Sequence, residues 1–278
     1  MAFKISSKQM QSNVTGKPHT KQNQYYFSSN GKQHILQYTE EEKDIGVIID
    51  KLEFDKHINE KINKATRTMA IIRRSFLCLN ESNFNFLYKA LVRSHLDYAA
   101  AVWSPYKQKH IEAIENVQRR ATKQLPGFRD LCYSDRLKKL QLPTLSYRRH
   151  RGDMIEVYKI VHSIYDNEIP SMLQLYADHS QRSDTRGHTF KLYQRRCITN
   201  LRKYNFSMRV VNTWNDLPEY VISAPSVNTF KNRLDECWKN QEIKYNYKGD
   251  VTKKLNCIPM HAQNSVNLKQ GHELTIEV

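Results

Sequence analysis

Basic side chains at helical spacing are the feature of this sequence that points most clearly to a chemistry. Lys and Arg number 44 against 28 Asp and Glu, which gives the 278 residues a formal net charge of +16. An excess of this size favours a polyanionic partner, either nucleic acid or an anionic membrane surface. Cationic groups along one side of a helix can contact successive phosphates without reading the bases. The candidate nucleic-acid-binding residues are Lys56, Lys64, Arg67, Arg74, Lys109, Arg119, Arg120, Lys123, Arg148, Arg149 and Arg151.

Signals for catalysis and metal binding are weaker. His95 and Asp97 could perform acid–base chemistry, but His95 falls on the apolar side of a predicted helix, which favours a packed core histidine. The acidic run Glu40–Glu42 is typical of a solvated turn. The histidines show no zinc-ligand spacing with the cysteines. The sequence therefore predicts no catalytic residue, no metal site and no cofactor.

Strand signals occur before residue 55. Residues 1–24 are polar and without periodicity, so we expect them to be disordered. In "YYFSSNGKQHILQY" the pair Asn30-Gly31 separates two runs of strand formers and favours a tight hairpin turn, because both residues tolerate positive φ. The segment "DIGVIID" (44–50) predicts a third short strand.

A long amphipathic helix is predicted over residues 55–76. Apolar residues recur there at alternating four- and three-residue steps, which is the spacing of one helical face. That face comprises Ile58, Ile62, Ala65, Met69, Ile72 and Phe76. At 100° per residue, the opposite face carries Lys56, Lys64, Arg67 and Arg74.

Two more helices are predicted over 82–103 and 106–125. Ser104-Pro105 separates them, because proline cannot continue a helix but suits the first position of the next one. Tyr98 and Trp103 are expected to pack at this corner. The predicted apolar sides are Phe84, Leu87, Tyr88, Leu91, His95, Tyr98 and Val102 on the first of these helices, and Ile111, Ile114, Val117, Ala121 and Leu125 on the second.

Further helices are predicted at 134–140, 144–165, 203–215 and 226–240, with a strand at 188–199. The sequence thus predicts a mainly α protein. Short N-terminal strands (25–54) precede a multi-helix bundle (55–166) and a smaller α+β region with helices and a short strand (167–248). Beyond 248 the periodicity is lost, so 249–278 is predicted to be a disordered tail.

Six segments support a relationship to a known family. In chain order they are "EEEKDIGVIID", "LEFDKHINEKINKATRTMAIIRRSF", "VRSHLDYAAAVWSPY", "IEAIENVQRRATKQLPG", "YSDRLKKLQLPTLSYRRHRGDMIEVYKI" and "RVVNTWNDLPEYVISAPSVNTFKNRLDECW". Over residues 40–248 they resemble the C-terminal part of jockey-like LINE (non-LTR retrotransposon) reverse transcriptases. The resemblance implies that 25–54 is the end of the palm and 55–166 the helical thumb. Ser94 stands where the family usually has proline, and Gln141 where glycine is common.

The resemblance also implies an activity, RNA-directed DNA polymerisation, which needs two Mg²⁺ ions held by paired aspartates. The chain contains no Asp-Asp pair, and the family's fingers and most of its palm would lie upstream of Met1. We therefore expect a truncated, catalytically incompetent fragment that binds duplex DNA or RNA–DNA hybrid without sequence preference. Two alternatives stay open: a translated remnant of a mobile element without function, and a helical module that binds a partner protein.

The sequence also bears on location. No stretch approaches the roughly 18–20 apolar residues of a membrane-spanning helix, and the N-terminus lacks the apolar run of a signal peptide. We expect an intracellular protein, nuclear or cytoplasmic and not secreted, without a membrane partner.

Overall fold

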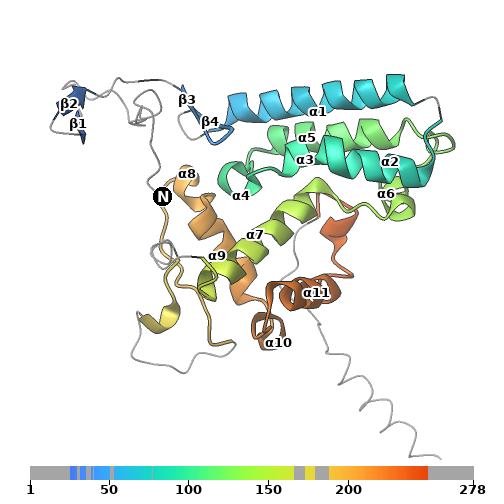
Figure 1. The fold of residues 1–278 in the computed structure, drawn as a ribbon. Coiled ribbons are helices and arrows are strands. Elements are labelled where there is room, and N and C mark those ends of the chain that lie inside the picture. The colour runs from blue at the N-terminus through green and yellow to red at the C-terminus, as the bar shows by residue number, and fades with distance from the viewer. Residues whose placement is uncertain are drawn as a thin grey trace, which may run out of the picture. The chain divides into compact units, whose positions relative to one another are not determined.

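The computed structural model describes residues 26–29, 32–35, 39, 41–50, 53–76, 78–165, 173–178 and 188–249. Within them the chain is mainly α-helical with short antiparallel hairpins on its N-terminal side, as predicted (Figure 1). The segments expected to be disordered, 1–24 and 249–278, lie outside the described residues apart from Gly249. The chain divides into two compact units between Arg129 and Asp130.

Two hairpins form the β structure. Strands β1 (Tyr26–Ser29) and β2 (Lys32–Ile35) pair antiparallel, with Ser29 opposite Lys32, which confirms the predicted hairpin; positions 30 and 31 themselves lie outside the described residues. Strands β3 (Glu41–Asp44) and β4 (Val47–Asp50) form the second hairpin. The prediction of a turn at the acidic run was therefore wrong for Glu41 and Glu42, which lie in β3. The turn falls one step later, at Ile45-Gly46, where both residues have positive φ.

Helix α1 (Asp55–Ser75) has the predicted apolar face over most of its length. Ile58, Ala65, Met69 and Ile72 are buried. Phe76 was wrongly assigned to this face: it follows the last turn in extended conformation and is 44% exposed.

The predicted helix 82–103 contains a π-helical turn that alters its buried face. It consists of α2 (Glu81–Leu87), the π turn η1 (Tyr88–Val92), α3 (Arg93–Asp97) and α4 (Ala100–Trp103). A π turn accommodates one more residue than an α turn, so later side chains are displaced along the face. From α2 to α3 the buried residues are Phe84, Tyr88, Val92 and Leu96, whereas Leu91 and Val102 are exposed and His95 is only half-buried, contrary to the prediction.

The corner near residue 100 is only partly as predicted. Ala99 has a φ of 51° and ends α3 before the proline is reached. Trp103 is confirmed as a core residue: it is 1% exposed, and its indole N–H donates to the Tyr98 carbonyl at 2.7 Å. The Tyr98 ring is instead 47% exposed, and its hydroxyl donates to the Ile45 carbonyl at 2.8 Å. Tyr98 therefore ties the β3–β4 turn to the helices.

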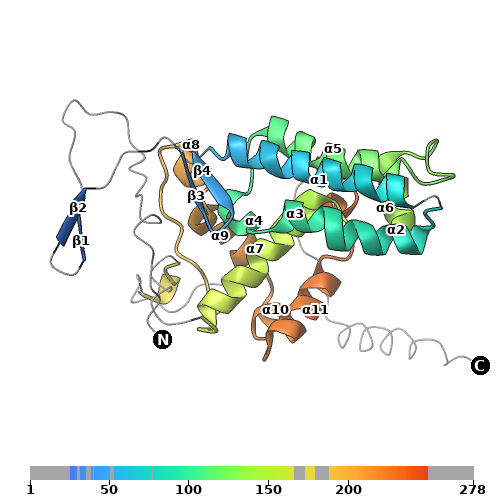
Figure 2. The same ribbon diagram turned by 45° about the horizontal axis from the view of Figure 1, so that its top comes forward.

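Helix α5 (Gln108–Thr122) lies beside α1 in both views of the fold (Figures 1 and 2). Its predicted apolar side is largely confirmed, since Ile114, Val117 and Ala121 are buried, as is Leu125 just beyond the helix. The sequence did not reveal that Glu115 and Gln118 are buried too. The Tyr88 hydroxyl donates to the Gln118 amide oxygen at 2.8 Å, which satisfies one polar group in this core.

The second unit has its own core around two tryptophans. Its elements are α6 (Tyr133–Leu140), α7 (Leu145–Val161), η3 (Tyr176–Asp178), α8 (Asn200–Lys203), α9 (Phe206–Asn215), α10 (Glu219–Ile222), α11 (Val227–Cys237) and η4 (Glu242–Lys244). The Tyr158 ring of α7 stacks on Phe230 of α11, with centroids 4.3 Å apart, in a cluster that includes Trp214 and Trp238. Helices α6 and α7, which the sequence analysis placed in the bundle 55–166, thus belong to the second unit.

The strand predicted at 188–199 is reduced to an isolated bridge between Leu175 and Leu192. The Asn215 side chain takes the place of a neighbouring strand at this point. Its amide oxygen accepts from the Leu192 N–H at 2.8 Å, and its amide nitrogen donates to the Leu192 carbonyl at 2.9 Å. Leu192 is thereby satisfied without a sheet.

Replacing Trp103 with alanine should lower the free energy of unfolding of the first unit by about 3–5 kcal/mol, because the change leaves a cavity where a large ring was buried. Urea denaturation followed by circular dichroism measures this. The matched control is Val102→Ala in the same helix, where the side chain is 56% exposed and the expected loss is below about 0.5 kcal/mol. Equal losses in the two variants would contradict the assignment of Trp103 to the core.

Replacing Gln141 with glycine should stabilise the second unit by about 0.5–1 kcal/mol. Gln141 ends α6 with a φ of 51°, a backbone conformation that costs an L side chain energy and costs glycine none. Its N–H and that of Leu142 donate to the last carbonyls of the helix, so the turn itself is kept. Thermal unfolding measures the gain. Lys138→Gly, inside α6, should show the opposite sign.

Candidate nucleic-acid interface

Helices α1 and α5 run in the same direction, and Asp55 joins their N-terminal ends. Its carboxylate accepts from His110 Nε2 at 2.8 Å, Lys109 Nζ at 3.3 Å and Lys107 Nζ at 3.5 Å. Burial alone would raise the pKa of Asp55, but the hydrogen bonds from Lys109 and His110 and the nearby positive charges outweigh it, so this pKa is lowered. The ionised Asp55 carboxylate therefore connects the first turn of α1 to the first turn of α5.

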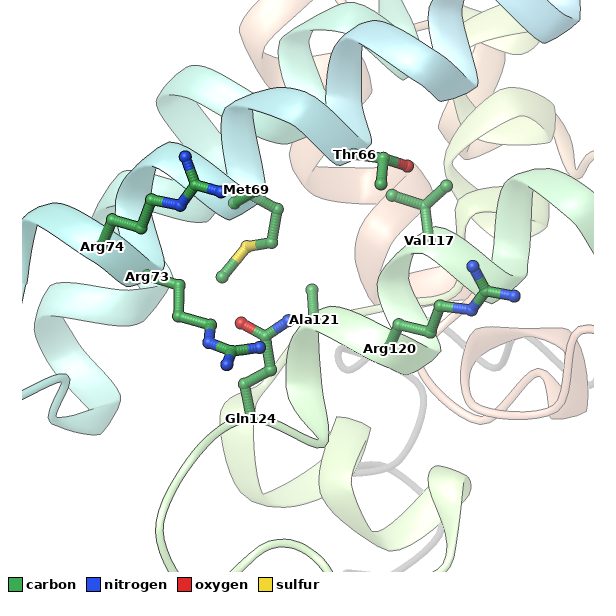
Figure 3. Close-up of a pocket in the computed structure, with 9 residues that line it drawn as sticks. Thr66, Met69, Arg73, Arg74, Val117, Arg120, Ala121 and Gln124 are labelled. Atoms are coloured by element: carbon green, nitrogen blue, oxygen red, sulfur yellow. The ribbon is translucent and has the colours of Figure 1, made fainter.

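A pocket of about 310 Å³ lies between the same two helices near their C-terminal ends (Figure 3). Its apolar floor is formed by Met69 of α1 and by Val117 and Ala121 of α5. The other lining residues are Thr66, Ala70, Arg73, Arg74, Arg120 and Gln124. Three arginines and no carboxylate thus surround an apolar hollow.

Five cations near this pocket have no protein partner. They project from α1 and from the end of α5, and all five are exposed. Within the described residues, none of the five forms an ion pair or a side-chain hydrogen bond, so their charge is available to an external anion. These free cations are Arg67, Arg73, Arg74, Arg120 and Lys123.

Four other candidates in the first unit already have partners. Lys56 contacts the carboxylate of Glu41, and Lys64 pairs with Glu60 at 2.6 Å. Lys109 pairs with Asp55, as described above. Arg119 donates to the Asn116 side chain at 2.9 Å. Surface ion pairs are weak, but those of the three lysines place a carboxylate beside each cation, whereas Asn116 is neutral and only holds the Arg119 side chain in place.

The three candidates on α7 belong to the second unit and contribute to its fold. Arg148 is half-buried and Arg149 is 6% exposed. Arg151 donates through two nitrogens to the carboxylate of Asp235 on α11, at 2.6 and 2.7 Å. The three arginines that cluster in the sequence therefore do not form an exposed cationic patch.

Arg73 is a pocket residue that the sequence analysis missed. It lies four residues after Met69 and next to Ile72, at the edge of the apolar stripe, so a helical-wheel argument assigns it to neither face. Long arginine side chains can cover apolar surface with their methylene groups while the guanidinium stays in water. The useful signal was the doublet Arg73-Arg74 in the last turn of a helix.

His57 has the most strongly lowered pKa among the histidines of the described residues, and no pattern in the sequence indicates it. It is fully buried, its Nδ1 accepts from the Ile48 N–H at 3.1 Å, and its ring meets Trp103 edge-on at 5.2 Å. Burial, assisted by the charge of Lys61, lowers the pKa of His57 to about 4. A neutral, enclosed imidazole joins β4 to α4 and is not accessible for acid–base catalysis.

The first unit therefore offers a surface with five cations that are unpaired within the described residues. No three His, Cys, Asp or Glu side chains of the described segments converge as a metal site would require. None of the described helices is long and apolar enough to cross a bilayer. Comparison with protein-family models, curated proteins and solved structures finds no significant match to this chain.

Lowering the pH from 7 to about 4.5 should destabilise the first unit through His57. The unfolded chain binds a proton at this residue near pH 6.5, whereas the folded chain binds it only near pH 4, so stability is lost as the pH falls through this window. The full effect is at most about 3 kcal/mol. The measurement is urea denaturation at both pH values, with His57→Gln expected to lose less stability than the wild type.

His95→Gln is the matched control for this experiment, because it removes a half-buried imidazole instead of a fully buried one, and the change in pH dependence should be larger in His57→Gln. A titration of the His57 ring by NMR with a midpoint near 6.5 would contradict the burial of a neutral imidazole.

Proposed function

We propose that this chain is a helical nucleic-acid-binding module that contacts the phosphates of duplex DNA or RNA–DNA hybrid without sequence preference. The observation that carries the proposal is the set of five free cations on α1 and at the end of α5, with no carboxylate lining the pocket between them. Each contact with a phosphate releases condensed counterion, which drives binding without base recognition.

The arrangement on two helices is favourable for following a backbone. Arg67 and Arg74 lie seven residues apart on α1, which is about two helical turns or roughly 10 Å. Arg120 and Lys123 lie on the neighbouring helix end, close to the same pocket. The cations therefore form a patch rather than a single point charge, and a patch can engage several phosphates at once.

A relationship to the thumb of jockey-like LINE reverse transcriptases is part of the proposal. Two positions where the chain departs from the family pattern have suitable backbone geometry. Gln141, where glycine is common, has the left-handed conformation that glycine adopts most easily. Ser94, where proline is usual, is the second residue of α3, in the first turn after the π turn, and proline is tolerated in the first turn of a helix. Both observations support the relationship.

The proposal does not include polymerase catalysis by this chain. Nucleotide addition requires paired aspartates that hold Mg²⁺, and the sequence contains no Asp-Asp pair. Such a module can contribute affinity for a duplex and can hold the duplex in position.

Neutralising two free arginines should weaken the salt dependence of duplex binding. In the Arg67→Gln, Arg74→Gln double variant, the slope of log affinity against log salt should become less steep by about 1.8, which corresponds to the loss of two phosphate contacts. The fold should be retained, because both side chains are exposed. The measurement is fluorescence anisotropy of a labelled duplex between about 50 and 200 mM salt.

The Lys56→Gln, Lys64→Gln double variant is the matched control. It removes the same formal charge from the same helix, but from lysines paired with Glu41 and Glu60, so its slope should change by less than one contact. Equal changes in both double variants would mean that only net charge matters. No binding by the wild type at the lowest salt would refute the proposal and favour a remnant without function.

A further inference from the structure

The pocket between α1 and α5 combines three features that a general phosphate-binding surface does not need: a hollow, an apolar floor, and neutral hydrogen-bonding side chains among the cations (Figure 3). Exposed cations are sufficient to hold the phosphates of a duplex backbone, and such binding needs neither a hollow nor an apolar floor. We propose that this pocket is a binding site for a phosphorylated nucleoside, with the base on the apolar floor and the phosphate at the arginines.

The floor suits a flat, weakly polar group. Met69 is 5% exposed and Val117 6%, so both side chains are held in place by the core and present only a small apolar surface to the hollow. Methionine adapts its shape to an aromatic partner and makes favourable sulfur–aromatic contacts. The volume of about 310 Å³ lies at the lower end of the range for small-molecule sites, about 300–1,000 Å³.

The cations define the charged part of the ligand. Arg73 and Arg74 come from α1 and Arg120 from α5, so arginine side chains of both helices line the pocket (Figure 3). A planar guanidinium binds phosphate through two parallel hydrogen bonds. None of the three has a partner within the described residues, and no carboxylate lines the pocket to compete with an incoming anion. A dianionic phosphate fits this charge better than a single carboxylate does.

Gln124 and Thr66 argue for a base rather than an acyl chain. A glutamine amide can donate and accept at once, which matches the mixed edge of a nucleobase. Both side chains line the pocket beside the apolar floor. An acyl chain would need a long apolar channel, whereas this floor consists of a few short side chains.

This inference goes beyond the proposed function, because a filled pocket is not required for duplex binding. The two share Arg73, Arg74 and Arg120, so the test must separate them by shape rather than by charge. Ala70 allows this: it lines the pocket from the exposed side of α1. Ala70→Leu places a larger side chain at the hollow, removes no charge and favours the helix nearly as well.

The experiment titrates the whole chain, labelled with ¹³C in its methionine methyl groups, with adenosine 5′-monophosphate at low salt. Met69→Leu assigns the Met69 signal. We expect the Met69 signal to shift saturably as the nucleotide is added. Adenosine and inorganic phosphate, tested separately, should bind at least about tenfold more weakly than the nucleotide, because each can make only one half of the interactions. Ala70→Leu should weaken binding of the nucleotide by about tenfold or more.

Two controls accompany this variant. Ala90→Leu introduces the same change at an exposed alanine of the π turn, which does not line the pocket, and nucleotide binding should be unchanged. Binding of labelled duplex by Ala70→Leu should keep its affinity and salt slope, because all five free cations remain. If the wild type binds the nucleotide but does not bind duplex, the proposed function is refuted and the nucleotide site is not.

A competition arm identifies the source of the nucleotide. Single-stranded hexadeoxyadenylate with a 5′-phosphate and the same strand with a 5′-hydroxyl are tested as competitors of the mononucleotide. Preferential displacement by the phosphorylated strand assigns the pocket to a strand end, and failure of both strands assigns it to free nucleotides. The inference is overturned if the nucleotide does not saturate the Met69 shift, if phosphate alone binds as tightly, or if Ala70→Leu binds the nucleotide as the wild type does.

Discussion

The packing of α1 against α5 sets the geometry on which the first unit depends. The two helices run side by side in the same direction, and the Asp55 carboxylate joins their N-terminal ends. Their C-terminal ends, which carry partial negative charge, therefore lie near each other. Basic residues in the last turns, Arg73 and Arg74 on α1 and Arg119 and Arg120 on α5, are favoured there. The positive charge near the C-terminal ends of α1 and α5 therefore reflects the parallel direction of the two helices as well as the basic composition of the chain.

Periodicity predicted the helices well because burial of an apolar stripe is what stabilises them. The stripe of α1 and that of α5 are visible in sequence and are largely the ones that pack. Periodicity failed where the backbone departs from 3.6 residues per turn. The π turn at Tyr88–Val92 carries no marker residue that periodicity detects, so Leu91 and His95 were assigned to a core that Val92 and Leu96 occupy.

The candidate site could be predicted only in part, because a helical wheel does not show tertiary partners. Arg67 and Arg151 look alike in sequence, yet Arg151 binds a carboxylate 84 residues away and Arg67 has no partner in the described part of the chain. Domain membership is hidden in the same way. The apolar side of α7 is evident from its spacing, but only the fold shows that Tyr158 packs on Phe230 of the second unit. Pairing across long sequence separations is the information that local patterns lack.

The π turn also affects how this helix should be aligned with others. Its buried residues follow steps of four, from Phe84 to Tyr88, Val92 and Leu96. If one residue were absent within the turn, the steps would become four, three and four, which is the pattern of an uninterrupted α-helix. The segment is therefore equivalent to an ordinary helix that has gained a single amino acid by insertion. An alignment to a relative with a regular helix should place its one-residue gap between positions 88 and 92, where the extra residue is accommodated without rotating the rest of the helix away from the core.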